Sequence, residues 1–234
     1  MRKIAIITIY DPTNYGNRLQ NYALSQILSH YASVETLVIF SENWLKVTWK
    51  QIKEMVVIKA GYDLTKTGPK KVDKASRARI RNFKKFNSLI KKRFIIYKSP
   101  KRMKKVLKKY DFCIVGSDQV WNPSFWNYED PNKLFAKFFL KDVEPSKRVA
   151  VAASFGGNKI PKEWEGRFAN ELKKFHNISV RENGAKKIVK ELTGKECSLL
   201  VDPTLVLNKR EWDQVINMST LNLSASQYIL KYFL

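Results

Sequence analysis

The chain repeats one pattern along most of its length: a short apolar run rich in β-branched residues, a polar turn, and then an amphipathic stretch with helical spacing. After the first run, 3–10, apolar residues recur at three- and four-residue steps from Leu19 to Tyr31. The next run, 34–40, follows closely enough to favour a right-handed crossover between parallel strands. Further strands are predicted at 112–115, 148–154, 177–181 and 198–202, and helices at 162–175 and 182–193. The alternation predicts an α/β fold, with a parallel, Rossmann-like sheet flanked by helices.

Composition and cysteine content limit the class of protein and the cellular compartment that we expect. The 234 residues are 44% hydrophobic and 28% charged, which is typical of a globular protein with a buried core. Cys113 and Cys197 both lie in apolar stretches, and no Cys/His cluster offers a metal site. The first apolar run is too short for a signal-peptide core, and no apolar stretch approaches the roughly 18 residues of a membrane span. We therefore expect a cytoplasmic protein with no bound metal.

The net charge of +23 is concentrated in one segment. Eighteen of the 44 Lys and Arg residues lie between Lys70 and Lys109, together with one acid, Asp73. Apolar residues recur at helical steps from 75 to 94, and a second basic stretch lies at 101–110, so two cationic amphipathic helices are predicted. These helices either present a solvated face or bind an anionic surface such as a membrane. Their aromatic residues fall at helical spacing and no nucleic-acid-binding signature is present, so nucleic acid is not expected as a partner.

Two regions do not follow the repeated pattern. The stretch 42–69 has no clear period and is predicted to be a variable excursion. Near the end of the chain, a helix around 211–215 is followed by Tyr228–Leu234 (YILKYFL), a strand-like run with no helix after it. This run either closes an edge of the sheet or opens a second domain. We predict a Rossmann-like domain at 1–206, containing the basic helical segment 70–109, and a linker with the first strand of a second domain at 207–234.

Polar residues follow two of the predicted strands at the edge where open α/β sheets bind ligands. In the first turn, a glycine permits close backbone approach and helix N-terminal amides attract anions. After 112–115, a carboxylate can bind a sugar hydroxyl or act as a base. The alternatives are an ordinary Asn/Gly turn in the first case and a helix cap in the second. The residues concerned are Asn14, Gly16 and Asn17 in the first turn, and Ser117, Asp118 and Gln119 after 112–115.

Three further residues are candidates for the same site. Trp121 belongs to an aromatic loop that either stacks on a carbohydrate or packs within the protein. Arg181 follows the strand at 177–181, where a planar guanidinium can hold phosphate or carboxylate, and Glu182 follows it. The alternative for Arg181 is an ion pair with Glu182 or Asp202. Because Asp before Pro commonly ends a strand, Asp202 is not predicted to be catalytic.

Five segments taken together, NYGNRLQNYAL, YDFCIVGSDQVWNP, VAASFG, SVRE and VDPTL, resemble the polysaccharide pyruvyl transferase family in order and interval. The resemblance implies the fold of the N-terminal domain of a two-domain, B-type glycosyltransferase. It also implies transfer of the pyruvyl group of phosphoenolpyruvate onto two hydroxyls of a cell-surface polysaccharide, forming a ketal. The donor is a substrate, so no cofactor is implied. The acceptor would be a saccharide or a lipid-linked oligosaccharide, with peripheral contact to the inner face of an anionic membrane.

The resemblance also implies roles for individual residues. It puts Asn14, Gly16 and Asn17 at an interdomain cleft, Asp118 near the acceptor and Arg181 near the charges of the donor. Asp118 and Arg181 are thus the predicted catalytic residues; the predicted substrate-binding residues are Asn14, Gly16, Asn17, Ser117, Gln119, Trp121 and Glu182. Members of the family are longer and are thought to supply a histidine and further arginines from a second domain, so the chain is similar to an N-terminal half.

Two other functions fit parts of the sequence. One is a nucleotide-sugar glycosyltransferase of the same architecture, which fold alone does not separate from a pyruvyl transferase. The other is a non-catalytic module that binds a membrane surface or nucleic acid through the basic segment. Neither a serine-elbow G-x-S-x-G nor a Walker loop is present, so hydrolases of that type and P-loop NTPases are not supported.

Overall fold

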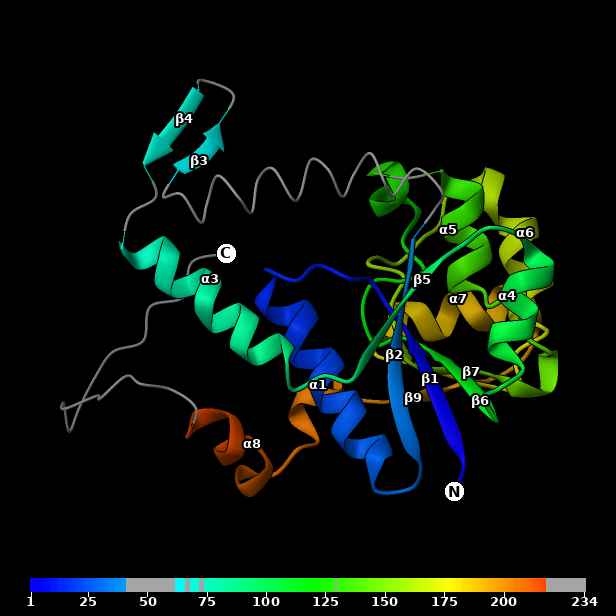
Figure 1. Ribbon diagram of the computed structural model, residues 1–234. Helices are drawn as coiled ribbons and strands as arrows, with labels where there is room; N and C mark the ends of the chain where they lie inside the picture. The colour runs from blue at the N-terminus through cyan, green and yellow to red at the C-terminus, as the bar shows by residue number, and fades with distance from the viewer. Residues whose placement is uncertain (41–61, 66–67, 72–73, 129, 218–234) are drawn as a thin grey trace.

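A seven-stranded parallel sheet forms the centre of the computed structural model, which describes residues 1–40, 62–65, 68–71, 74–128 and 130–217 (Figure 1). The strand order is β5-β2-β1-β6-β7-β8-β9. The strands are β1 (Lys3–Ile7), β2 (Ser33–Phe40), β5 (Lys92–Ile96), β6 (Phe112–Val115), β7 (Arg148–Ala153), β8 (Asn177–Val180) and β9 (Ser198–Leu199). The prediction of a parallel, Rossmann-like α/β sheet is confirmed.

The sheet grows in opposite directions from β1. The chain first adds β2 and β5 on one side, and then adds β6, β7, β8 and β9 on the other. In register, Ile6 of β1 lies beside Thr36 of β2 and Ile114 of β6. The border between β1 and β6 is therefore the topological switch point, outside which doubly wound sheets bind their ligands.

Helices cover both faces of the sheet (Figure 1). Along β1, Ile4 and Ile6 pack towards α1, while Ala5 and Ile7 join the larger core on the opposite face, as the two-residue period of a strand requires. Three helices lie on the first face: α1 (Tyr15–Ser29), α3 (Lys74–Asn87) and α8 (Lys209–Ile216). Those on the second face are α4 (Pro100–Leu107), α5 (Pro131–Phe138), α6 (Lys162–Leu172) and α7 (Asn183–Thr193).

The described residues also include a short hairpin and three turns of 3₁₀ helix. A small antiparallel hairpin is formed by β3 (Tyr62–Thr65) and β4 (Gly68–Lys71). Turns of 3₁₀ helix occur at η1 (Pro123–Tyr128), η2 (Pro145–Lys147) and η3 (Pro203–Leu205). Most of the predicted excursion at 42–69 and all of Tyr228–Leu234 lie outside the described residues, and the predicted domain division remains a prediction. Leu207 and Trp212, which follow the predicted boundary, pack with Tyr22 of α1.

The prediction of one continuous helix from 75 to 94 is wrong in its second half. Helix α3 ends at Asn87, and the chain then forms β5 at the edge of the sheet, with Phe94 beside Val38 of β2. Ile90 continues the helical spacing of apolar residues, but it is buried against α1 after the helix has ended. The apolar residues at helical spacing therefore belong to α3, to the turn after it and to β5, and not to one helix.

The two cationic helices lie on opposite faces of the sheet. Phe83 and Phe86 of α3 pack against Tyr15 and Tyr22 of α1, with ring centroids 4.5 and 5.4 Å apart. Helix α4 instead buries Met103 and Leu107 in the larger core. The basic segment thus forms two separate charged surfaces. No helix among the described residues is both long enough and apolar enough to cross a bilayer.

Candidate functional site

A cleft of about 610 Å³ opens at the carboxyl ends of the strands, beside the switch point. Its walls come from the turn after β1, the turn after β6, the segment that follows β8 and β9, and helix α8. Six of the predicted site residues line it: Asn14, Gly16, Asn17, Asp118, Gln119 and Arg181. The structure therefore brings together predicted site residues from three distant parts of the chain.

The first turn has both a structural role and a position in the cleft. Asn14 is the N-cap of α1, since its side-chain oxygen accepts a hydrogen bond from the backbone amide of Asn17 at 2.9 Å. A methyl group at Gly16 would lie 3.6 Å from the Asn14 Oδ1, an ordinary contact, so packing does not require a glycine there. The alternative of a turn selected for its geometry thus holds for Asn14, and both residues still line the cleft.

Asp118 is held in the cleft by the first turn. Its Oδ2 accepts a hydrogen bond from Asn17 Nδ2 at 2.7 Å, and its Oδ1 accepts one from the backbone amide of Gln119 at 2.8 Å. These contacts join the end of β1 to the end of β6. A carboxylate fixed in this way can accept a proton from, or a hydrogen bond from, a hydroxyl in the cleft.

Arg181 forms an ion pair with Asp202 and also lines the cleft. The distance from Arg181 Nη1 to Asp202 Oδ2 is 3.0 Å, and Asp202 accepts three more hydrogen bonds, from the amide and hydroxyl of Thr204 and the hydroxyl of Ser117. Among the described residues, Nη1 is the only guanidinium nitrogen of Arg181 with a hydrogen-bond partner. The Asp202 alternative is thus the observed pairing, and it leaves donors on Arg181 for an anion in the cleft.

Two of the predicted substrate-binding residues, Trp121 and Ser117, are buried and do not line the cleft. Trp121 has no exposed surface: its ring packs between Phe139 and Phe155, and its Nε1 donates to the carbonyl of Phe138 at 3.1 Å. Trp121 and Trp126 of the aromatic loop turn into the core, which contains many other aromatic rings, whereas Phe125 of the same loop is exposed. Ser117 is also fully buried, and its amide donates to Gln20 Oε1 at 3.1 Å, so it joins α1 to β6 instead of facing a substrate.

Of the two remaining predicted substrate-binding residues, Gln119 and Glu182, only the first is part of the cleft wall. Gln119 lines it, and its side-chain oxygen accepts a hydrogen bond from Asn122 at 2.9 Å. Glu182 precedes α7 and does not line the cleft, and its Oε1 accepts a hydrogen bond from the hydroxyl of Ser154. Substrate contact by Glu182 remains a prediction.

Other residues of the site were not predicted. Gln20 lines the cleft one helical turn after Asn17, and Trp212 lines it from α8. The sequence did contain a signal for Gln20, since the polar residues Asn17, Gln20 and Asn21 recur at helical spacing. In the structure all three are buried on the side of α1 that faces the sheet. Nothing in the sequence signals that Trp212 folds back onto α1. Within the described ranges, no group of three or more His, Cys, Asp or Glu side chains is arranged to hold a metal ion.

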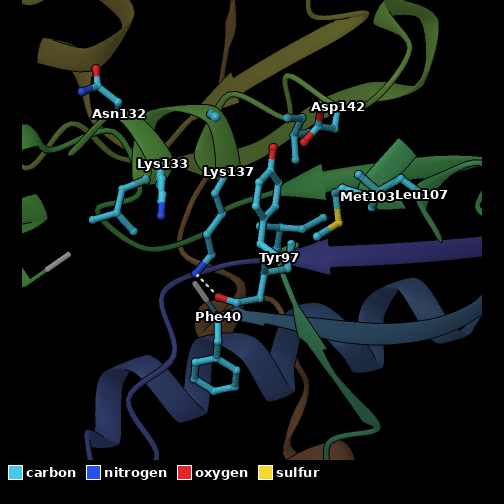
Figure 2. A pocket seen from close by; sticks show the side chains of 13 residues that line it. Phe40, Tyr97, Met103, Leu107, Asn132, Lys133, Lys137 and Asp142 are labelled. Carbon is cyan, nitrogen blue, oxygen red and sulfur yellow. Dashed lines mark hydrogen bonds between the residues drawn. The ribbon is translucent and has the colours of Figure 1, made fainter. Parts of the chain in front are cut away.

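A second cavity, of about 170 Å³, lies on the opposite face of the sheet between β2, α4 and α5 (Figure 2). Its lining is mainly apolar, and Lys137 donates to the carbonyl of Ile39 at 3.3 Å. Burial and the neighbouring Asp142 carboxylate raise the pKa of Tyr97, at its wall, to about 12, so this phenol stays protonated. None of the predicted site residues lines this cavity, and the polar cleft is therefore the candidate site.

A doubly wound parallel sheet with a polar cleft at its switch point defines a Rossmann-like protein, a class whose members bind their ligands at the strand ends. The family model for polysaccharide pyruvyl transferase matches residues 14–234, and the chain belongs to that family. The recognised resemblance is confirmed, and membership makes the protein a transferase with a saccharide acceptor. Searches of curated proteins and of solved structures found no match.

Proposed function

We propose that the protein transfers the pyruvyl group of phosphoenolpyruvate to two hydroxyls of a polysaccharide unit, forming a pyruvate ketal. One observation carries the proposal: a carboxylate, Asp118, and a guanidinium with free donors, Arg181, line the same cleft at the switch point. The family supports the reaction type, and the cleft offers two of the kinds of group that the reaction requires, a base and an anion-binding cation.

The reaction needs a cation for the donor and a base for the acceptor. A general acid protonates C3 of the enol and creates a positive C2, and one sugar hydroxyl adds to C2 and gives its proton to a base. Phosphate then leaves, and a second hydroxyl adds to C2 and loses its proton, which closes the ketal. Arg181 would hold the phosphate or carboxylate of the donor in a bidentate manner and stabilise the departing phosphate. Asp118 would orient the attacking hydroxyl and accept its proton. The resemblance implies a histidine and further arginines in a second domain for the remaining steps.

Binding of the donor tests this proposal against a nucleotide-sugar glycosyltransferase. We expect phosphoenolpyruvate to raise the Tm of the full chain by several degrees when it is present at about 100 times its Kd, since this concentration adds about 2.7 kcal/mol of stability. Inorganic phosphate and pyruvate, each supplied alone, should have a smaller effect. Transfer of label from the pyruvyl carbons of phosphoenolpyruvate into acid-labile saccharide then tests the chemistry. Stabilisation by a nucleoside diphosphate sugar but not by phosphoenolpyruvate would contradict the proposal and support the glycosyltransferase.

We further propose that α4 contacts an anionic membrane at the inner face of the cell, where a lipid-linked acceptor would be presented. The residues that carry this proposal share exposure and positive charge, and none forms an ion pair with a described acid. Because the apolar residues of α4 are buried in the core, contact would be electrostatic and without insertion. The six residues are Lys101, Arg102, Lys104, Lys105, Lys108 and Lys109.

Sedimentation with vesicles tests the α4 proposal, with α3 as the matched control. We expect vesicles containing phosphatidylserine, but not pure phosphatidylcholine, to bind the full chain. Changing four α4 lysines to glutamine should weaken binding about a hundredfold or more, since each cation near the surface contributes about 1 kcal/mol. The control changes four α3 cations to glutamine and alters net charge equally. Equal loss in both variants would show that total charge, and not the α4 surface, governs binding. The α4 substitutions are at Lys101, Lys104 and Lys105 in the helix and at Lys108, its C-cap, and the α3 substitutions are at Arg77, Arg81, Lys84 and Lys85.

A further inference from the structure

Arg18 lies in the first turn of α1, beside the cleft, yet its side chain is directed into the protein. The residue is 1% exposed and does not line the cleft. Its Nε donates to Asn17 Oδ1 at 3.0 Å, its Nη2 donates to the same oxygen, and its guanidinium lies 4.7 Å from the centre of the Tyr10 ring. An arginine at a helix N-terminus next to a candidate anion site would be expected to bind the anion, but burial excludes that role here.

The charge of Arg18 is weakly compensated by its surroundings. In the described part of the chain no acid forms an ion pair with it, and its Nη1 has no hydrogen-bond partner. Burial lowers the pKa of Arg18, and the adjacent Tyr10, together with Asp11 and Asp118, acts in the opposite direction. The Nη2 of Arg18 also donates to the carbonyl of Ile9 at 3.4 Å, so its described hydrogen-bond partners are neutral oxygens. A buried cation without a paired carboxylate costs stability, so a purely structural role is a poor explanation for it.

The contacts of Asn17 indicate what Arg18 does. The Asn17 Oδ1 accepts the two hydrogen bonds from Arg18 and a third from the amide of Asp11 at 3.0 Å. Its Nδ2 donates to the carbonyl of Ile9 at 2.8 Å and to Asp118 Oδ2 at 2.7 Å. The two ends of an asparagine amide have nearly the same shape, so hydrogen bonds alone decide its orientation. A flipped amide would face the guanidinium with its NH₂ group and the Asp118 carboxylate with its oxygen, which is unfavourable at both ends.

We propose that Arg18 is a positioning residue that fixes the Asn17 amide so that Nδ2 always faces Asp118. The guanidinium acts on Asp118 only through Asn17 and touches no substrate. The consequence for catalysis rests on the proposed function, in which Asp118 receives the proton of the acceptor hydroxyl. The first turn would thus contribute the Nδ2 donor of Asn17, whose orientation the buried Arg18 guanidinium fixes, in addition to the N-terminus of α1.

Hydrogen exchange of the Asn17 side-chain amide tests the proposal without any substrate. In the ¹⁵N-labelled full chain, the Asn17 NH₂ signal is identified by its absence from Asn17→Asp. We expect its exchange to be about tenfold faster or more in Arg18→Met, because charge-assisted hydrogen bonds that hold the amide are lost. Arg18→Lys should also exchange faster, since one ammonium cannot replace the two-nitrogen contact to a single oxygen. If Arg18→Met does not fold, Arg18→Lys decides the result. Unchanged exchange in a folded Arg18 variant would overturn the proposal.

Arg148 provides the matched control. It is also a buried arginine, 5% exposed, but it is bound to Glu171 at 3.0 Å and to backbone carbonyls at the opposite end of the sheet. Arg148→Met should lower stability and leave Asn17 exchange unchanged, so faster exchange in both variants would show general loosening and overturn the assignment. In the transfer reaction, Arg18→Met should lower kcat with little change in the KM for phosphoenolpyruvate. Because exchange needs no substrate, it decides on Arg18 even if the wild-type chain transfers nothing from phosphoenolpyruvate.

Discussion

Replacing Gly116 with alanine should prevent stable folding of the chain. Gly116 follows β6 with φ at +120°, a conformation that an L side chain rarely adopts. An added Cβ would lie 2.2 Å from the carbonyl oxygen of Val151, a backbone atom of the neighbouring strand β7. Relief would require β6 and β7 to separate, so we expect a loss of several kcal/mol, a large part of the stability of a typical domain. Urea unfolding and the yield of soluble protein measure it.

Gly166→Ala is the control for that experiment. Gly166 lies within α6, and a Cβ there would meet nothing within 4 Å. Alanine has the higher helix propensity, so this variant should be stabilised by about 0.5–1 kcal/mol. A Gly116→Ala protein with the unfolding midpoint of the wild type would show that the conformation at the end of β6 is not required.

Replacing Arg181 with glutamine should lower kcat/KM for phosphoenolpyruvate by about 10² to 10³, the usual effect of removing one donor that stabilises developing charge. The side chain lines the cleft, two of its guanidinium nitrogens have no hydrogen-bond partner among the described residues, and the Asp202 carboxylate, which also lines the cleft, holds the third. Arg181→Lys keeps the charge but loses the planar, two-nitrogen contact, so it should recover only part of the activity. Steady-state kinetics of the folded variants measure both effects.

Arg167→Gln is the matched control, because it makes the same chemical change on α6, where Arg167 packs over Phe135 and Trp164. We expect its kcat/KM to equal that of the wild type. An Arg181→Gln enzyme with unchanged kcat/KM would remove Arg181 from the donor site and leave the Asp202 ion pair as its whole role.

The strands that the sequence located most clearly are those with long apolar runs. β1 is apolar after its first residue, β6 is apolar throughout and β2 is apolar over its second half, because these stretches are buried on both faces of the sheet. β5 escaped prediction because it is an edge strand with exposed Arg93 and Phe94, and its composition therefore continues that of the cationic helix before it. A strand covered on one side only carries a weaker pattern than a central one.

The position of the cleft could be predicted from the rule that open α/β sheets bind ligands at the carboxyl ends of their strands. That rule correctly brought Asn17 and Asp118 to one edge of the sheet, 2.7 Å apart, and placed Arg181 in the same cleft. It gives no side-chain direction, so it could not show that Trp121 turns into the core or that Arg18 lies behind Asn17. Those orientations depend on packing between segments that are distant in sequence.

The hydrogen bond between Asn17 and Asp118 spans 101 positions of the chain. A growing polypeptide therefore cannot join the first two walls of the cleft until β6 has been synthesised and paired with β1. Closing so long a loop carries an entropic cost that only the finished sheet offsets. A ligand that bridges the two turns would bind only molecules in which this pairing has formed. Ligand binding would accordingly protect the central strands from unfolding as a unit, well beyond the residues that it touches.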